Sequence, residues 1–530
     1  MRYSVFLTAF ALLATSCGGS LLTGDFSVSP LPKEIVLKDG DPFVFGKRIV
    51  IKSPDDLGTV AGLLAADLEE AFGTRPEVRE NKGDIILGLD PALPAEGYRI
   101  ECGKDALKIT GGSPAGVLYG AKTVYKALPS RCEGRAALPA AVVQDSPEYP
   151  YRGFMVDVAR HFFSVDYLKE LIDIMSLHGI NVFHWHLTDD QGWRVPVPGY
   201  PKLTEVGSFR PGTIVAPGSD EYDTIPVEGF YTEDEMKEIV RYAADRQITV
   251  IPEIDLPGHM LAALASYPEL GCTGGPYEVP QRFGVFEDVL CPGKDATIEF
   301  AKAVLEEIMD IFPSEYIHLG GDECPKSRWE KCPDCQARIK SLGLKDIPGK
   351  SKEERLQTWF MDQMRSTLKA RGRKMMGWDE VLEGTPDKDI VVCAWTSPSA
   401  VSRSATEGHT TIVCPIQHYY FSNPRFNKLQ GRESISRVYD FKIVPDGLTP
   451  EQAGNIIGSQ ACIWTEWVAD STKMEWEMLP RLAAIAESQW GCPKDLGAFL
   501  PRLRKMTELY DRRGWNWKED IAQAWEEVVE

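Results

Sequence analysis

The sequence has no excess of basic residues. Its 530 residues include 58 lysines and arginines against 78 aspartates and glutamates, which gives a formal net charge of −20. A nucleic-acid-binding face needs a basic patch or stripe, and nothing in the sequence resembles one. We therefore expect no nucleic-acid partner, and an acidic surface that favours neutral or cationic partners.

Long apolar runs are also missing after the first residues, so no later segment is expected to span a bilayer. The chain begins with Arg2, a short apolar run at 5–13 and small residues at 14–16, directly before Cys17. This pattern is typical of an export signal, and small residues ending at a cysteine resemble a bacterial lipoprotein signal. We expect 1–17 to act as that signal, with a lipid on Cys17 as the sole membrane contact. The location would then be the periplasm, outer membrane or cell surface of a Gram-negative bacterium. The alternative is an ordinary signal peptide with an incidental cysteine.

The sequence has 12 cysteines but only one CxxC motif, at Cys332 and Cys335, with Cys324 nearby. Such a motif occurs in zinc and redox sites, but no second ligand pair at zinc spacing follows it. We therefore expect these cysteines to form a structural disulfide or to remain free thiols, and we expect neither a metal nor a cofactor. In an exported chain disulfides are possible, and the pair expected to form one is Cys272 and Cys291, which bracket a loop-like segment.

The first part of the chain predicts a small α+β domain. Residues 18–25 have the composition of a short linker, and 26–148 alternate between strand-like runs with one amphipathic helix at 57–73. The segment around 137–153 then connects to a different pattern.

From Arg152 onward, short apolar runs recur with helical stretches between them. Eight such runs over 149–495 predict a (β/α)8 TIM barrel, followed by a helical tail at 496–530. A doubly wound sheet is the alternative fold. The expected strands are 152–160, 181–190, 248–255, 316–323, 374–380, 389–395, 410–416 and 458–467.

Acids, an arginine and tryptophans gather at the carboxyl ends of these expected strands. Burial alone would not place so many acids after apolar strands, whereas barrel enzymes build their sites on this face. A doubly wound sheet would not by itself predict this decoration on nearly every strand. The residues are Arg160, Asp189, Asp190, Glu253, Asp255, Asp322, Glu323, Trp378, Asp379, Glu380, Trp395, Trp464 and Glu466.

Acids and tryptophans together suit a sugar, since indole faces stack on its ring and carboxylates bind its hydroxyls. Asp322 and Glu323 are adjacent, which has a cost because neighbouring carboxylates repel when both ionise. Glycoside cleavage usually needs two carboxyls about 5–10 Å apart. In the alternative mechanism, the substrate's own 2-acetamido group attacks the anomeric carbon. One acid then protonates the leaving oxygen, while a second carboxylate orients the acetamide.

Six segments occur in order: "RHFF", "NVFHWHLTDDQGWR", "PEIDLPGH", "HLGGDE", "GWDE" and "IWTEW". Together they resemble the β-N-acetylhexosaminidases of glycoside hydrolase family 20. The similarity runs from about residue 26 to beyond 490, and an α+β domain before a barrel also fits the family. The resemblance implies an exo-acting, retaining enzyme that removes terminal non-reducing β-linked GlcNAc or GalNAc through an oxazolinium intermediate.

The resemblance also implies roles for four residues of the reacting centre. Glu323 matches the general acid/base, and Asp322 matches the residue that holds the acetamido nitrogen. Asp189 and His259 match a pair behind the acid, in which the histidine tunes Glu323. A general acid near neutral pH needs a raised pKa, and a coupled His–Asp pair can set it. The alternative is that His259 is an inert core histidine.

Further residues match substrate contacts in the family. Tyr420 matches the tyrosine that hydrogen-bonds the acetamido carbonyl, with Tyr419 as a neighbouring candidate. The other matches are the pocket walls Trp378, Trp395 and Trp464, and the residues that bind outer hydroxyls, Arg160 and Glu466. The alternative for Arg160 is that it only pairs with Asp157 or Asp189.

Two features leave questions open. Family members often carry an acid or asparagine two positions after the tyrosine, but here Ser422 is followed by Asn423, which puts discrimination at the 4- and 6-hydroxyls in doubt. His184 and His186 resemble a metal spacing, but they alternate with Trp185 along a strand and are expected to pack inside the barrel.

Alternative functions are a disaccharide-releasing relative, a lipid-tethered sugar-binding protein without turnover, and a zinc-dependent hydrolase using the cysteine cluster.

Overall fold

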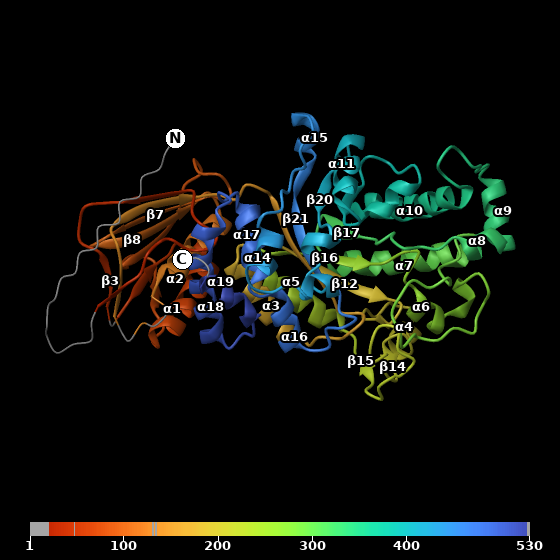
Figure 1. Cartoon of the computed structure of the whole chain (residues 1–530), viewed down its shortest axis with the longest axis horizontal. Coiled ribbons are helices and arrows are strands. Elements are labelled where there is room, and N and C mark those ends of the chain that lie inside the picture. Colours follow the sequence, from red (N-terminus) through yellow and green to blue (C-terminus); the bar gives the residue numbers. More distant parts are fainter. Residues whose placement is uncertain (1–20, 47, 130–131, 133–134, 527–530) are drawn as a thin grey trace.

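The computed structural model describes residues 21–46, 48–129, 132 and 135–526. An N-terminal domain and a barrel lie side by side along the long axis of the molecule, with the C-terminal helices α17 (Arg481–Trp490) and α18 (Leu496–Arg513) between them (Figure 1). Within the described residues, no helix is both long enough and apolar enough to cross a bilayer.

The N-terminal domain is built on a seven-stranded sheet with the order β2-β10-β7-β8-β6-β4-β5. Its strands are β2 (Glu34–Leu37), β4 (Val50–Lys52), β5 (Glu77–Arg79), β6 (Ile85–Leu89), β7 (Tyr98–Gly103), β8 (Ala106–Gly111) and β10 (Ala141–Asp145). A second, three-stranded sheet has the order β1-β9-β3. It is formed by β1 (Leu22–Thr23), β3 (Phe43–Phe45) and β9 (Ala136–Leu138).

This domain contains two long helices rather than the one expected, α1 (Gly58–Phe72) and α2 (Pro114–Ala127). The sequence pattern missed α2 because every residue from Gly116 to Ala127 is buried, so the helix shows no polar face. Its start nevertheless carries local signals. Ser113 is the N-cap and accepts a hydrogen bond from the Ala115 amide, and Pro114 occupies the first turn.

The second domain is a closed barrel of eight parallel strands, which confirms the predicted fold class. The order is β11-β21-β20-β19-β18-β17-β16-β12, and pairing of β11 with β12 closes the ring. The eight are β11 (Tyr151–Asp157), β12 (Val182–Asp189), β16 (Thr249–Ile254), β17 (Tyr316–His318), β18 (Lys374–Trp378), β19 (Val391–Ala394), β20 (Thr411–Val413) and β21 (Ile456–Ile463). A short strand, β13 (Gly192–Trp193), extends the sheet beside β12.

Helices surround the barrel, and several begin at strong sequence signals. Thr232 caps α5 and Ser351 caps α10 in capping boxes completed by Glu235 and Glu354. The long helices are α3 (Val165–Leu177), α5 (Glu233–Asp245), α7 (Asp295–Ile311), α10 (Lys352–Ala370), α11 (Pro398–Glu407) and α14 (Gly431–Tyr439). The remaining elements of the described chain are α4 (Lys202–Glu205), α6 (Leu261–Ser266), α8 (Ser327–Lys331), α9 (Pro333–Ser341), α12 (Ile416–Tyr419), α13 (Pro424–Asn427), α15 (Pro450–Gly454), α16 (Ser471–Met478), α19 (Gln523–Glu526), η1 (Asp55–Leu57), η2 (Pro268–Leu270), η3 (Asp379–Glu383), η4 (Glu519–Ala522), β14 (Phe209–Arg210) and β15 (Val227–Glu228).

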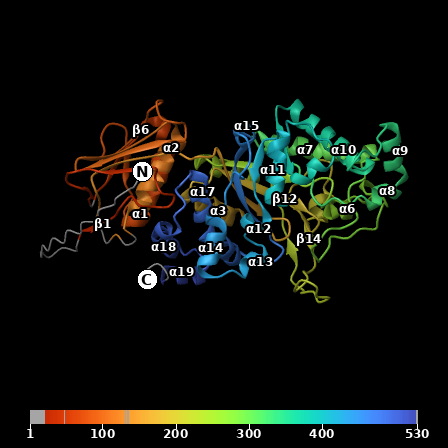
Figure 2. The same ribbon diagram turned by 45° about the horizontal axis from the view of Figure 1, so that its top comes forward.

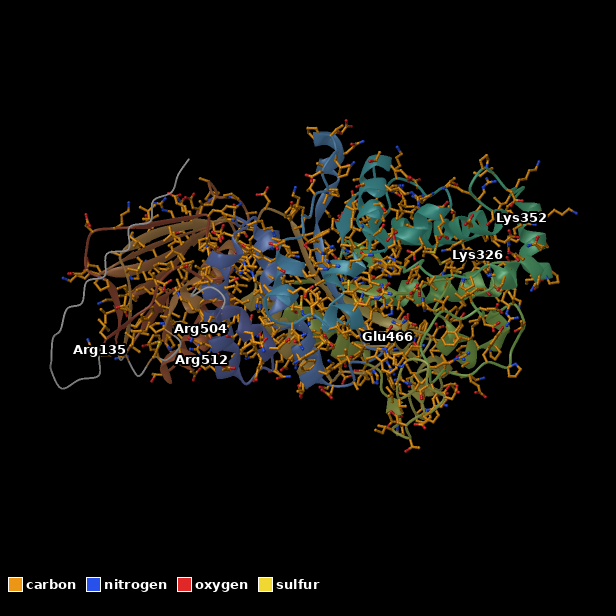
Figure 3. The ribbon with its side chains drawn as sticks, viewed as in Figure 1. Arg135, Lys326, Lys352, Glu466, Arg504 and Arg512 are labelled. Atoms are coloured by element: carbon orange, nitrogen blue, oxygen red, sulfur yellow. The ribbon has the colours of Figure 1, made fainter. Side chains whose placement is uncertain are left out.

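Helix α18 joins the two domains through charged side chains. Arg512 donates to Glu70 at 3.0 Å, and Arg513 donates to Asp67 at 3.2 Å, both on α1. The two helices lie together in a second view (Figure 2), and Arg512 lies at the junction (Figure 3). An ion pair adds to this contact, because the buried Arg152 of β11 binds the partly exposed Glu96 of the N-terminal domain at 2.7 Å.

A buried carboxylate organises the barrel interior. Glu253 on β16 accepts contacts from His184 at 2.9 Å, His186 at 2.6 Å and His318 at 2.9 Å. Although burial opposes ionisation of Glu253, the three imidazoles hold its pKa well below its usual range. A buried charge needs such partners. The two histidines of "HWH" therefore pack inside the barrel, as their alternation along the strand predicts.

Candidate active site

A cavity of about 280 Å³ opens among residues that follow the barrel strands. It is lined by Arg160, His259, Asp322, Glu323, Trp395, Ile416, Tyr420, Ser422, Asn423, Pro424, Trp464, Glu466 and Trp467. Eight of the ten residues singled out in the sequence for catalysis or substrate binding are in this lining. The other two, Asp189 and Trp378, lie behind it.

The adjacent acids Asp322 and Glu323 reach one site because the backbone turns sharply after β17. Gly320 and Gly321 have φ angles of 64° and 95°, and Glu323 has a φ of 42°. A Cβ on Gly320 would lie 1.7 Å from a carboxylate oxygen of Asp255, so only glycine fits there. A left-handed backbone at a non-glycine residue costs on the order of 1–3 kcal/mol and is found at functional sites.

His259 connects both acids to a second pair of carboxylates. Its Nε2 lies 3.5 Å from Glu323 Oε2 and 3.7 Å from Asp322 Oδ2. On the other side, Nδ1 lies 3.0 Å from Asp190 Oδ2 and 3.2 Å from Asp189 Oδ1. Burial opposes protonation of this ring, but the two aspartates raise the pKa of His259 well above its usual value. The ring thus carries a positive charge toward Asp322 and Glu323.

Sequence reasoning assigned only Asp189 to this histidine, and it missed Asp190. Asp190 makes the shorter contact with His259, and its other oxygen accepts the Leu261 amide at 3.0 Å. The second acid of "LTDD" was the available signal. Asp189 instead lies at a junction, since its Oδ2 also contacts Arg160 at 2.8 Å and His186 at 3.0 Å.

Arg160 combines structural ion pairs with a place in the cavity wall. It binds Asp157 at 3.2 Å and Asp189 at 2.8 Å, and its guanidinium lies over the Trp464 ring at 5.1 Å. Burial opposes ionisation of Asp189, but the charges of Arg160 and His259 hold the pKa of that carboxyl well below its usual range. The ion pairs therefore fix Arg160 in the position from which it lines the cavity.

Asp322 has an acceptor atom that is not used within the described structure. Its side chain is 9% exposed, and Oδ1 is buried without a hydrogen-bond partner. Burial raises the pKa of Asp322 to about 6, against the opposing charge of His259. An unpaired buried acceptor is costly. At a cavity wall it is suited to an N–H donor on a ligand.

Aromatic rings form the apolar part of the wall. Tyr420 stacks on Trp395 with ring centroids 5.6 Å apart, and it lies 6.1 Å from Trp464. Tyr419, the neighbouring candidate, is fully buried and packs edge-on against Phe441. Tyr420 is thus the tyrosine of this pair that reaches the cavity.

Trp378 is the last residue of β18 and Trp395 directly follows the neighbouring strand β19, but the two have different surroundings. Trp378 is fully buried, and its ring centroid lies 5.7 Å from that of Trp464. Its Nε1–H donates to Glu253 Oε1 at 2.8 Å, so Trp378 supports the cavity wall from behind. Trp395 donates its Nε1–H to Glu380 at 2.8 Å. The sequence marked Glu380 only as an acid at a strand end, without this positioning role.

Ser422, where the sequence departs from the family pattern, holds a neighbouring wall residue. Its hydroxyl accepts the Trp464 amide at 2.9 Å. Asn423 follows it and also lines the cavity. A hydroxyl that is engaged with the backbone therefore stands where family members often carry an acid or asparagine, and the Asn423 side chain beside it lines the same cavity.

Comparison with known proteins decides the family. The model of the glycosyl hydrolase family 20 catalytic domain matches residues 149–493, and that of domain 2 of the same family matches 25–146. The chain belongs to glycosyl hydrolase family 20. It is therefore a glycoside hydrolase by family, and its N-terminal domain is the family's domain 2.

Individual relatives agree with this assignment. A beta-hexosaminidase of Porphyromonas gingivalis is 36% identical over 513 residues, covering 93% of this chain but only 64% of the relative, slightly under two thirds of its length. A beta-hexosaminidase of Akkermansia muciniphila is 35% identical, covering 79% of this chain and 84% of the relative.

Solved structures of family 20 share the fold. An exo β-N-acetylglucosaminidase from Vibrio harveyi in complex with N-acetylglucosamine has a TM-score of 0.81 at 30% identity, covering 96% of this chain and 81% of that one. A β-N-acetylhexosaminidase from Bacteroides fragilis has a TM-score of 0.78 at 31% identity, covering 93% and 98%.

The disulfide expected between Cys272 and Cys291 of this family 20 chain is wrong. Both are free thiols in the structure. They lie instead in a group of four with Cys332 and Cys335. A second pair of cysteines therefore meets the CxxC motif in space and precedes it in the chain. Sequence spacing alone did not show that the two segments meet.

The pKa of Asp322 predicts the acid limb of the pH profile. If the ionised carboxylate is required, kcat/KM falls as the pH drops below about 6, because protonation then removes the charge. The charge of His259 lowers that pKa, so His259→Asn shifts the acid limb to higher pH, in addition to any loss of rate. The measurement is kcat/KM against pH for both proteins. An unshifted limb would show that the histidine charge does not act on Asp322.

Proposed function

We propose that this enzyme removes single terminal β-linked GlcNAc or GalNAc residues from the non-reducing end of glycans. The observation that carries the proposal is the buried, unpartnered oxygen of Asp322 beside Glu323, in a cavity walled by Trp395, Tyr420 and Trp464. The cavity volume of about 280 Å³ lies near the lower limit for ligand pockets. A space of this size supports recognition of one sugar ring.

The proposed reaction uses the substrate's own acetamido group as nucleophile. Its carbonyl oxygen forms a bond to the anomeric carbon while the bond to the leaving oxygen breaks, and Glu323 gives its proton to that oxygen. Asp322 accepts the acetamido N–H and stabilises the cationic oxazolinium. Water, deprotonated by Glu323, then attacks the same carbon and reopens the ring. Two inversions give net retention.

The remaining residues position the sugar. Tyr420 would donate its hydroxyl to the acetamido carbonyl, and the indoles of Trp395 and Trp464 would enclose the acetamido methyl, with Trp378 behind them. Arg160 and Glu466 would bind outer hydroxyls. Solved relatives support a sugar of this kind as the substrate, since the Vibrio harveyi structure contains N-acetylglucosamine and a Streptomyces plicatus structure contains the product GlcNAc.

Product analysis tests the exo-acting proposal. With a chito-oligosaccharide, the first product should be GlcNAc in the β configuration, released one unit at a time, because the reaction retains configuration. Chromatography identifies the released sugar, and NMR during the first turnovers identifies its anomer. Release of a disaccharide would favour a lacto-N-biosidase-like relative. Binding without release would favour a non-catalytic glycan-binding protein, and an α-anomer as first product would contradict the mechanism.

We also propose that the chain is exported and tethered through a lipid on Cys17, facing the periplasm or the cell surface. Residues 1–20 lie outside the described part of the structure, so the proposal rests on the signal-like sequence before Cys17. Fractionation tests it. The native chain should remain with membranes, whereas Cys17→Ala should not carry lipid. Equal partitioning of the two would leave an ordinary signal peptide as the explanation.

A further inference from the structure

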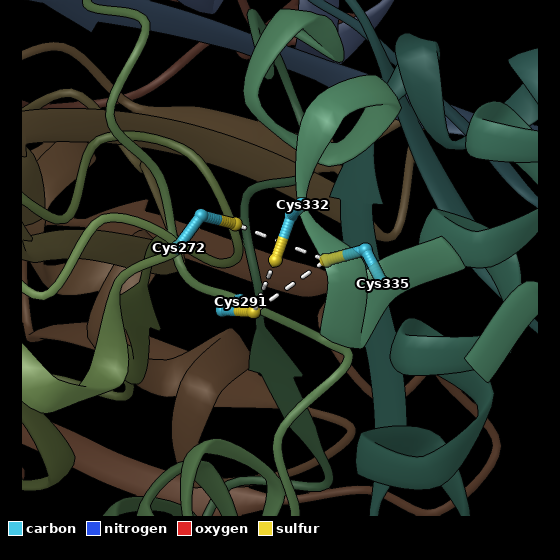
Figure 4. A group of neighbouring side chains, drawn as sticks. All are labelled: Cys272, Cys291, Cys332 and Cys335. Atoms are coloured by element: carbon cyan, nitrogen blue, oxygen red, sulfur yellow. Dashed lines mark hydrogen bonds between the residues drawn. The ribbon is translucent and has the colours of Figure 1, made fainter. Parts of the chain in front are cut away.

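Four cysteines meet between two segments that follow neighbouring barrel strands; the second segment includes the start of α9. Cys272 and Cys291 come from the segment after β16, and Cys332 and Cys335 come from the segment after β17 (Figure 4). The Sγ atom of Cys291 lies 3.6 Å from that of Cys332 and 3.5 Å from that of Cys335, while Cys272 lies 3.8 Å from Cys335. All four sulfurs lie within 4.8 Å of one another, and three of the side chains are buried.

These distances match a metal site and not disulfides. A disulfide joins two sulfurs at about 2.0 Å. With zinc–sulfur bonds of about 2.3 Å, the four sulfurs of a tetrahedral site lie about 3.8 Å apart. The observed separations of 3.5, 3.6 and 3.8 Å fall near that edge length. We propose that Cys272, Cys291, Cys332 and Cys335 bind one zinc ion.

The backbone and the apolar side chains around the four cysteines are closely packed. A Cβ on Gly293 would lie 2.3 Å from the Cys335 nitrogen, so the two loops touch there at backbone level. Cys332 is the N-cap of α9, a position that favours an anion because free amides point toward it. An apolar shell that includes Val289, Trp329 and Leu356 limits access of water to the sulfurs.

Cations lie against the same loops. Four thiolates around Zn²⁺ carry a net negative charge, which needs compensation when partly buried. Lys294 donates to the Gly271 carbonyl at 2.7 Å, one residue before Cys272. Arg338 of α9 donates to the Gly293 carbonyl at 3.3 Å. Both side chains therefore bring positive charge to the segment that carries Cys272 and Cys291.

The proposed zinc would brace the catalytic turns and take no part in the chemistry. All four positions of the ion are filled by sulfur, which is the mark of a structural site. The Leu290 amide, next to Cys291, donates to the Pro257 carbonyl at 3.0 Å, two residues before His259. The segment that carries Cys332 and Cys335 also carries Asp322 and Glu323, which precede the two cysteines in the chain. A Cβ on Gly258 would lie 3.1 Å from the Asp322 carbonyl, so these turns touch. The ion would therefore hold together the two turns that carry His259 and Glu323.

Metal analysis of the full chain, purified without chelator and with zinc in the medium, tests the proposal. Elemental analysis should find about one zinc ion per chain, and Cys335→Ser should lose it. Cys102→Ser, which changes a buried cysteine of the N-terminal domain, should keep it. Iron in place of zinc, four reduced thiols without metal, or disulfides found by mass spectrometry would each overturn the zinc assignment.

A second measurement does not depend on a variant that folds. Replacing zinc in the native chain by cobalt(II) should give the visible absorption of tetrahedral thiolate coordination, and stripping the metal with a chelator should lower Tm on the order of 5 °C. Adding zinc back should restore both metal content and Tm. A chain that shows no cobalt spectrum, or whose Tm is the same before and after stripping, would contradict the proposal.

Discussion

Asp322→Asn is expected to lower kcat/KM for aryl 2-acetamido-2-deoxy-β-glucosides by about a hundredfold or more, even when the leaving group is good. Removing one preorganised charge-stabilising group typically costs on the order of 3 kcal/mol of barrier. Asp322 lines the cavity in which an oxazolinium would form, and its buried Oδ1 has no hydrogen-bond partner among the described residues. The amide of asparagine cannot neutralise that cation, so both activated and poor leaving groups are affected.

Asp446→Asn is the matched control, because this carboxylate is exposed and its ion-pair partner among the described residues is Lys442 on the surface. Its kcat/KM should equal that of the native chain. A loss of less than about tenfold for Asp322→Asn would remove Asp322 from its proposed role. Circular dichroism of each variant separates a chemical effect from a folding defect.

Glu323→Gln is expected to have an effect that depends on the leaving group. For poor leaving groups, which need a proton, the loss should reach about 10²–10⁴-fold, the usual contribution of a general acid. For a nitrophenolate, which leaves without a proton, the first step should be much less affected. The measurement is kcat/KM over a series of aryl glycosides, plotted against the pKa of the leaving phenol.

The native chain should show a shallow dependence on leaving-group pKa, and Glu323→Gln a steep one. Glu299→Gln, an exposed glutamate on α7, serves as the control and should behave as the native chain. The same slope in all three proteins would mean that the general acid is another residue. Small and equal losses in both Asp322→Asn and Glu323→Gln would overturn both assignments.

The barrel could be predicted from the sequence because its strands are short, apolar and separated by amphipathic helices. The same strands end in polar residues, so the sequence also located the functional face. Ordered motifs then supplied the family. By contrast, α2 was missed because it is buried on nearly all sides and has no amphipathic period. The cap at Ser113 and Pro114 was the remaining local signal.

Contacts between segments that are distant in the chain could not be predicted from the sequence. The sequence alone does not distinguish Asp189 from Asp190 as the partner of His259. In the structure, Asp190 makes the shorter contact with His259. Cys272 and Cys335 are 63 positions apart. No periodic pattern in the sequence marks a contact between side chains so far apart in the chain. Trp378 and Trp395 both stand at the carboxyl ends of strands, but Trp378 is buried behind the cavity and Trp395 lines it.

The central claim is that the substrate supplies its own nucleophile, and one comparison tests it most directly. The chain without residues 1–17 is assayed on two aryl β-glycosides that differ only at carbon 2, 2-acetamido-2-deoxyglucose and plain glucose. Rapid release from the first and almost none from the second is the predicted result. Comparable release from both would mean that the enzyme carries its own nucleophile, and that the roles proposed for Asp322 and Glu323 are wrong.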